Sequence, residues 1–96
     1  MLTGKQRSYL KGIANSIQPI LQIGKGGINE NVICQFDEAL EARELIKATV
    51  LRNSEDDART ACEEIAGLTG AEIVQVIGSR FVLYRESKNN KVINLP

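Results

Sequence analysis

Residues 19–31 read P-I-L-Q-I-G-K-G-G-I-N-E-N, and the organisation of the chain can be worked out from this stretch. A short apolar run, Ile20–Ile23, ends at three glycines within four residues, with Lys25 as the one long side chain among them. Asn29 follows at the N-cap position of a helix, where an asparagine oxygen accepts from an amide of the first turn. We therefore predict a strand, a tight glycine loop and a helix in succession.

The glycine loop, Gly24–Gly27, has two interpretations. Glycine adopts positive φ and lets another molecule approach the backbone, and the amide groups at the start of a helix form an anion site. Lys25 is long enough to reach a phosphate bound there. The alternative is a structural turn between strand and helix, and the spacing alone leaves both open because a lone glycine-rich signal is weak.

The composition describes one small domain. Of 96 residues, 43% are apolar, which is enough for a core and too many for a disordered chain. There is no apolar run near the roughly 18 residues of a membrane span, and the first residues carry Lys5, Arg7 and Lys11 without the apolar run of a secretory signal. The two cysteines, Cys34 and Cys62, form no CxxC pair. We expect a single domain over residues 1–96, with 86–96 as a C-terminal tail, in a cytoplasmic protein without disulfides.

The net charge is zero, but the charges are unevenly distributed. Residues 1–27 contain four bases and no acid, residues 28–72 contain eleven acids and four bases, and residues 73–96 contain four bases and one acid. The segments therefore have net charges of +4, −7 and +3. This asymmetry predicts a basic face opposite an acidic one, although helix surfaces also carry charge for solubility alone.

The first predicted helix starts at a capping box formed by Thr3 and Gln6. Arg7 and Lys11, four residues apart, share its polar side. The helix ends before Pro19, because the residue before a proline disfavours the helical conformation.

Two further helices are predicted. The second follows Asn29 and has acids on its outer side, where Cys34 also projects. We expect these acids to raise the pKa of the Cys34 thiol and keep it neutral, and we interpret Cys34 as a surface or rim residue rather than a nucleophile. The third starts at Ser54, since Asp57 three residues on resembles a second capping box, and it ends at Gly70. Its predicted buried stripe is Ala58, Ala61, Cys62, Ile65 and Leu68.

Three more strands are predicted at Leu45–Leu51, Ile73–Ile77 and Arg80–Tyr84, the last two joined by a Gly78-Ser79 hairpin. The predicted fold class is α/β, a two-layer α-β-α-β-α-β-β arrangement with a four-stranded mixed sheet in the order 1-2-4-3. Each strand–helix–strand unit is expected to cross over right-handed with its strands parallel. If the second and third helices cover the same face, both crossovers step in the same direction, and the hairpin places the fourth strand, which is apolar on both faces, between strands two and three. Ligands of such sheets tend to bind beyond the carboxyl ends of the strands. Lys25, Arg52 and Arg80 fall at that edge, whereas Arg85 falls at the opposite one.

Four motifs in this order resemble the CRM domain, named for chloroplast RNA splicing and ribosome maturation, and its bacterial stand-alone YhbY-type members in particular. They are T-G-K-Q-R-x-x-L-K-G at the start, P-I-x-Q-I-G-K-G-G-I at 19–28, E-L-I-K at 44–47 and V-Q-V-I-G-x-x-x-V-L-Y-R at 74–85. The resemblance covers roughly residues 1–86. It implies a non-catalytic RNA-binding domain associated with precursors of the large ribosomal subunit. It also implies a fold similar to the C-terminal domain of bacterial translation initiation factor three.

The family's GxxG loop corresponds to Gly24-Lys25-Gly26-Gly27 and is likened to the loop with which KH domains clamp an RNA backbone. With the resemblance included, RNA contact becomes the favoured interpretation of this loop. The predicted RNA-binding residues are Gly24, Lys25, Gly26, Gly27, Lys5, Arg7, Lys11, Arg52 and Arg80. The bases of the first helix form one basic track with the loop bases only if packing brings them onto the same surface. The alternative interpretation of each base is a solvated charge that does not contact RNA.

The expected partners are ribosomal RNA and, as a further possibility, ribosomal proteins, with no membrane, small-molecule substrate, metal or cofactor. A protein-interaction module using the acidic helix faces is one alternative. A small nucleotide-binding enzyme is a second, weakened because the loop lacks a Walker pattern and the chain has no histidine. Base readout by stacking is poorly supported, since the chain has only four aromatic residues.

Overall fold

The structure, a computed structural model, describes residues 2–96, and Met1 lies outside the described residues. The elements in chain order are α1 (Gly4–Ala14), β1 (Leu21–Ile23), α2 (Glu30–Arg43), β2 (Leu45–Val50), α3 (Ala58–Thr69), β3 (Glu72–Ile77) and β4 (Arg80–Tyr84). The strands form one sheet in the order β1-β2-β4-β3, with β1 parallel to β2 and with β4 antiparallel to both of its neighbours. The predicted α/β class, the order of elements and the order of strands are confirmed.

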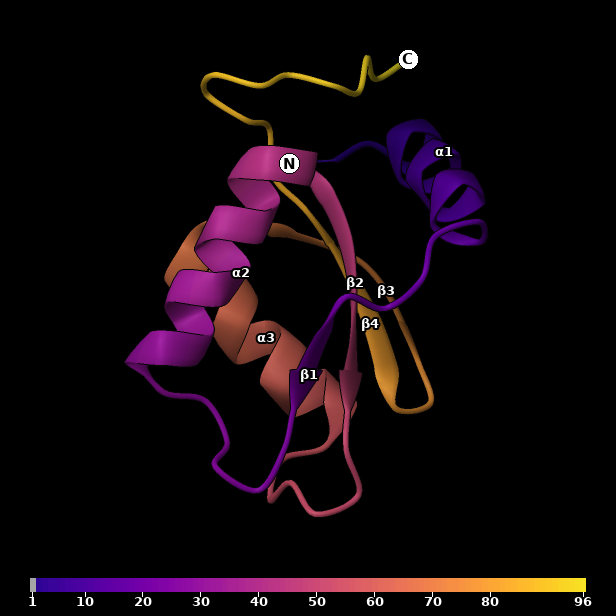
Figure 1. Ribbon diagram of the computed structural model, residues 1–96. Helices are drawn as coiled ribbons and strands as arrows, with labels where there is room; N and C mark the ends of the chain where they lie inside the picture. The colour runs from indigo at the N-terminus through magenta and orange to yellow at the C-terminus, as the bar shows by residue number, and fades with distance from the viewer. Residues whose placement is uncertain (1) are drawn as a thin grey trace.

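The sheet has helices on both faces (Figure 1). Side chains of β4 alternate between them, so that Phe81 and Leu83 join the cluster under α2 and α3, whereas Val82 and Tyr84 join the cluster under α1. All four are buried, as an interior strand requires. The layering differs from the two-layer prediction because α1, through Leu10, buries its apolar side on the face that α2 and α3 leave open.

Two of the three helices begin where their capping residues predict. In α1 the Thr3 side chain accepts from the Gln6 amide at 3.1 Å, while the Gln6 side chain accepts from the Thr3 amide at 3.0 Å, which completes the capping box. In α2 the Asn29 side chain accepts from the Val32 amide at 2.9 Å.

The third helix begins later than predicted. Asp57, not Ser54, is the N-cap of α3, and its carboxylate accepts from the Thr60 amide at 2.8 Å. This hydrogen bond holds the pKa of Asp57 below its ordinary value. The Ser54 hydroxyl instead accepts from the Asp56 amide within the preceding turn at 3.3 Å. Both residues are good caps, and the one next to the periodic apolar stripe is used.

The buried side of α3 includes Ala61 and Cys62 as predicted, and burial raises the pKa of the Cys62 thiol to about 12. Leu68 does not belong to it, because this residue is 61% exposed. Thr69 takes the last inward position, and its hydroxyl donates to the Ile65 carbonyl at 2.7 Å. The threonine is tolerated inside because this bond satisfies its polar group.

Cys34 lies on the exposed surface of α2, as predicted. Its thiol donates to a Glu38 carboxylate oxygen at 3.2 Å. This hydrogen bond and the charge of Glu38 raise the pKa of the Cys34 thiol, which keeps it neutral.

The C-terminal tail, residues 86–96, docks against the domain. Glu44 is fully buried, and its carboxylate accepts from the amides of Ser87, Val92 and Ile93 at 2.7, 2.6 and 2.6 Å. Burial opposes ionisation of Glu44, but these amides outweigh it and hold the pKa of Glu44 below its ordinary value. Ile93 and Leu95 then pack on the cluster under α1. Of the helices in residues 2–96, none combines the length and apolarity needed to cross a membrane.

Candidate nucleic-acid interface

The glycine loop is a closed β-turn. The Gly27 amide donates to the Gly24 carbonyl at 3.0 Å, which leaves Lys25 and Gly26 as the two central residues, both exposed. Gly27 has φ +66°, a conformation that residues other than glycine adopt only with strain. The turn therefore presents Lys25 at an outward corner between β1 and α2.

No neighbouring atom requires a glycine at Gly26, the second central residue of this turn. A Cβ added at Gly26 would meet no atom within 4 Å, and its φ is not positive. Within residues 2–96, the amides of Lys25 and Gly26 donate to no protein acceptor. The corner thus has open space and unengaged donors, which are what a backbone-contacting ligand needs.

Three loops meet at the edge of the sheet that holds this turn. The Leu51 amide donates to the Ile23 carbonyl at 2.8 Å, and the Val50 amide donates to the Ser79 carbonyl at 2.7 Å. The loops after β1 and β2 and the β3–β4 hairpin therefore lie side by side (Figure 1, lower edge).

Three of the predicted cations belong to these loops. Lys25, Arg52 and Arg80 are all exposed. The two ion pairs among residues 2–96 are Arg85–Asp37 and Lys91–Glu86, so all three are unpaired. The structure brings these three together at one edge, as the strand order predicts.

Two of the three bases of α1, Lys5 and Arg7, do not join them. The Arg7 Nε donates to the Ile73 carbonyl, near the start of β3, at 3.4 Å, and the Gln6 side chain donates to the Pro96 carbonyl at 3.3 Å. The first half of α1, with Lys5 and Arg7, therefore lies at the other end of the sheet, beside the C-terminal tail (Figure 1). Lys11 is exposed one turn further along the helix. Because α1 crosses the sheet in this direction, Lys5 and Arg7 are separated from the loop bases, and the predicted bases do not form one continuous track.

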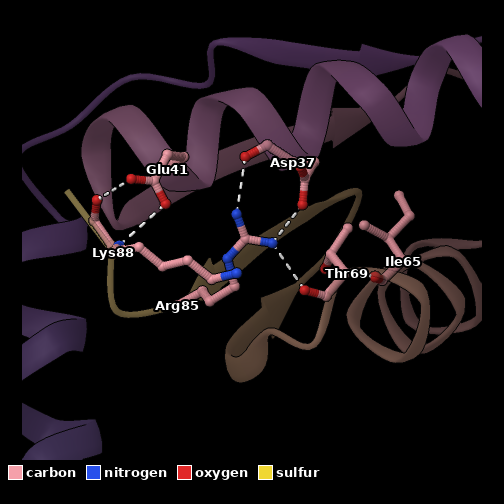
Figure 2. A network of polar contacts seen from close by, with 7 residues as sticks. Asp37, Glu41, Ile65, Thr69, Arg85 and Lys88 are labelled. Carbon is pink, nitrogen blue, oxygen red and sulfur yellow. Dashed lines mark hydrogen bonds and ion pairs between the residues drawn. The ribbon is translucent and has the colours of Figure 1, made fainter. Parts of the chain in front are cut away.

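Arg85 has a structural role at that far end (Figure 2). Its Nη1 donates to the Asp37 carboxylate at 2.6 Å and to the Thr69 carbonyl at 2.8 Å, while Nη2 donates to the Asp37 carbonyl at 3.0 Å. The guanidinium thus joins α2 to the C-terminal end of α3, and these donors are used within the protein.

Sequence reasoning missed two residues close to Arg80. Lys47 and Gln75 line a hollow of about 140 Å³ on the α1 face of the sheet, which we call the hairpin pocket. Its full lining is Asn15, Lys47, Gln75, Ile77, Arg80 and Val82. The register of three strands and the end of α1 bring these residues together, so the motifs at 44–47 and 74–85, which contain Lys47 and Gln75, do not by themselves indicate a pocket.

The acidic surface gathers elsewhere. A groove of about 600 Å³ between α2 and α3 has Glu30, Asp37 and Glu64 in its lining, together with the exposed Leu68. The negative charge of this groove is complementary to a basic segment of another protein. The alternative hypothesis of a protein-interaction module would place its partner on these helix faces.

The fold and this edge define a small α/β domain with an outward glycine turn flanked by unpaired cations, a combination typical of proteins that contact a nucleic-acid backbone. The chain belongs to the CRS1/YhbY (CRM) domain family, whose model matches residues 2–85. The predicted resemblance is confirmed.

Similar proteins support the same assignment. The probable RNA-binding protein YqeI of Bacillus subtilis is 52% identical over 96 residues, which is the whole of both chains. An RNA-binding protein of Haemophilus influenzae is 35% identical over 91 residues, 95% of this chain and 92% of that one. The solution structure of a hypothetical protein from Staphylococcus aureus, 59% identical, superposes over the full length of both chains with a TM-score of 0.81.

Proposed function

We propose that this protein binds RNA through the glycine turn and the cations beside it, and that its ligand is ribosomal RNA in precursors of the large subunit. Family membership and the RNA-binding names of its relatives support the class of ligand. The observation that carries the site is the exposed turn Gly24–Gly27, with unengaged amides and three unpaired cations on neighbouring loops.

The proposed mode is phosphate-directed. Turn amides and the Lys25 ammonium hold backbone oxygens, while Arg52 and Arg80 extend the contact along the sheet edge. Because phosphate contacts position an RNA without reading its sequence, the affinity depends on salt and on RNA shape more than on base order. The zero net charge limits the attraction at long range, so the local cations at this edge do most of the binding.

Titration of a structured ribosomal RNA fragment at several salt concentrations tests this proposal. We expect the logarithm of the association constant to fall linearly with the logarithm of salt, with a slope of about −0.7 for each phosphate contacted in a single strand. Lys25→Ala should weaken binding to different RNA sequences alike and should reduce the slope by about one such contact.

Lys5→Ala is the matched control, since it removes the same exposed charge from the far end of the sheet. We expect it to leave the affinity and slope nearly unchanged. An affinity that does not respond to salt would overturn the proposal, and equal losses in the two variants would overturn the location of the site.

A further inference from the structure

The hairpin pocket lies on the part of the sheet that α1 leaves uncovered. Across the strands, Val82 of β4 stands between Lys47 of β2 and Gln75 of β3 in one row. In the next row, Arg80 of β4 pairs with Ile77 of β3. Asn15, the C-cap residue of α1, forms the wall.

A β-bulge directs Gln75 into this pocket. Ile73 pairs with Leu83 and Gln75 with Val82, so Val74 is the extra residue. Both Val74 and Gln75 consequently lie on the α1 face, where strict alternation would place only one of them. Bulges are frequent next to functional sites, where they redirect a side chain.

The polar side chains of the pocket have no partners within the protein. Among residues 2–96, no hydrogen bond or ion pair engages the side chains of Asn15, Lys47, Gln75 or Arg80. Two of them are amides, each offering donors and an acceptor, and two are cations. The floor is apolar, with Val82 buried and Ile77 63% exposed.

The size and chemistry of the pocket restrict its ligand. At about 140 Å³ it is well below the roughly 300–1,000 Å³ of drug-sized sites, so it admits one small ring system. An apolar floor suits the face of a planar ring, amides suit its hydrogen-bonding edge, and no carboxylate lines the pocket to repel an adjacent anion. A nucleobase with its flanking phosphates combines these three properties.

We propose that the hairpin pocket binds a single unpaired nucleobase of the RNA, with Gln75 and Asn15 on the base edge and with Lys47 and Arg80 on the neighbouring phosphates. This proposal rests on the RNA-binding function proposed above and adds base recognition to it. Neighbouring strands are about 4.8 Å apart, so β1 and β4 are separated by roughly 10 Å across β2. One RNA strand crossing the sheet edge therefore reaches both the glycine turn and the pocket.

The test compares two RNA duplexes of the same sequence, one fully paired and one with a single unpaired base, made with each of the four bases in turn. We expect the protein to prefer at least one bulged duplex by about twofold to tenfold, which is the contribution of a typical hydrogen bond to the base edge. Gln75→Ala should abolish that preference and leave the affinity for the paired duplex unchanged. The side-chain amide signals of Asn15 and Gln75 in NMR spectra should shift with the bulged duplex only.

Thr49→Ala is the matched control, because Thr49 pairs with Arg80 on the same face but does not line the pocket. It should retain the preference. Equal binding of paired and bulged duplexes by the unmodified protein, or a preference that survives Gln75→Ala, would overturn the pocket while leaving phosphate-directed binding intact. Failure to bind either duplex would overturn both proposals.

Discussion

Gly26 and Gly27 are neighbours in sequence, but they are glycines for different reasons. Gly27 has positive φ, so a side chain there is strained whatever space surrounds it. Gly26 has no positive φ, and no atom lies within 4 Å of the position that a methyl group would take there, so alanine fits the isolated protein. The fold therefore does not require a glycine at position 26, and in the proposed function the open space there admits the RNA backbone.

This contrast gives a paired prediction. Gly27→Ala should reduce the free energy of unfolding by about 1 kcal/mol, which thermal unfolding would detect as a decrease in Tm of about 4–8 °C. Gly26→Ala should leave Tm unchanged or raise it, since alanine restricts the unfolded chain, but it should weaken RNA binding, because its methyl group occupies the space next to the turn amides. If Gly26→Ala bound RNA as tightly as the unmodified protein, close approach of the backbone at this corner would be excluded.

At the scale of elements, the start of α3 shows how two adjacent signals compete. Asp57→Ala should lower Tm by a few degrees, since it leaves the Thr60 amide without its acceptor. Ser54→Ala should have a smaller effect, because the Ser54 hydroxyl serves only the preceding turn. The pKa of Asp57 is lowered in the folded protein, so its contribution is present above the ordinary aspartate pKa and is lost as the pH falls through the lowered value.

Thermal unfolding of both variants at neutral pH and near pH 3 checks this assignment. The difference between Asp57→Ala and the unmodified protein should shrink at the lower pH, because below the ordinary aspartate pKa the unfolded state binds a proton at Asp57 before the folded state does. A larger loss from Ser54→Ala would mean that the predicted capping box, and not the observed one, starts the helix.

Local signals predict most elements of this chain, and the long-range arrangement explains the rest. The apolar run Phe81–Tyr84 and right-handed crossovers predict the strand order once the second and third helices are assumed to cover one face, and that order puts Lys25 and Arg80 at one edge. The direction of α1 is not encoded locally, so the position of Arg7 could not be predicted. The bulge at Val74 interrupts the alternation of side chains in β3. A sequence pattern therefore could not predict on which face of the sheet Gln75 lies.

At the scale of the whole molecule, the C-terminal tail connects the two sides of the sheet. Glu41 and Glu44, near the end of α2, accept hydrogen bonds from the tail, and Glu41 alone receives the Ser87 hydroxyl and the amides of Lys88 and Asn89. The tail then delivers Ile93 to the cluster under α1. These bonds lower the pKa of Glu41, the Ser87 hydroxyl first among them. Carboxylates of α2 therefore help to complete the core on the opposite face.

Glu44→Gln tests this connection. Glutamine keeps an acceptor but turns an NH₂ group toward amide donors, so we expect a loss of about 1–3 kcal/mol of unfolding free energy at pH 7 and faster hydrogen exchange in the tail. Because the folded pKa of Glu44 is lowered, its stabilisation is present above the ordinary glutamate pKa and is lost as the pH falls through the folded value. The variant should therefore lose less stability than the unmodified protein between pH 7 and pH 3.

Glu86→Gln provides the comparison, since Glu86 is an exposed carboxylate of the same tail that forms an ion pair with Lys91 at 3.0 Å. Exposed pairs of this kind contribute little, so this variant should unfold almost as the unmodified protein does at every pH. Urea unfolding across the pH range separates the two carboxylates. If both variants had the same pH profile, the buried carboxylate would not be what holds the tail, and the apolar contacts of Ile93 and Leu95 would have to be sufficient on their own.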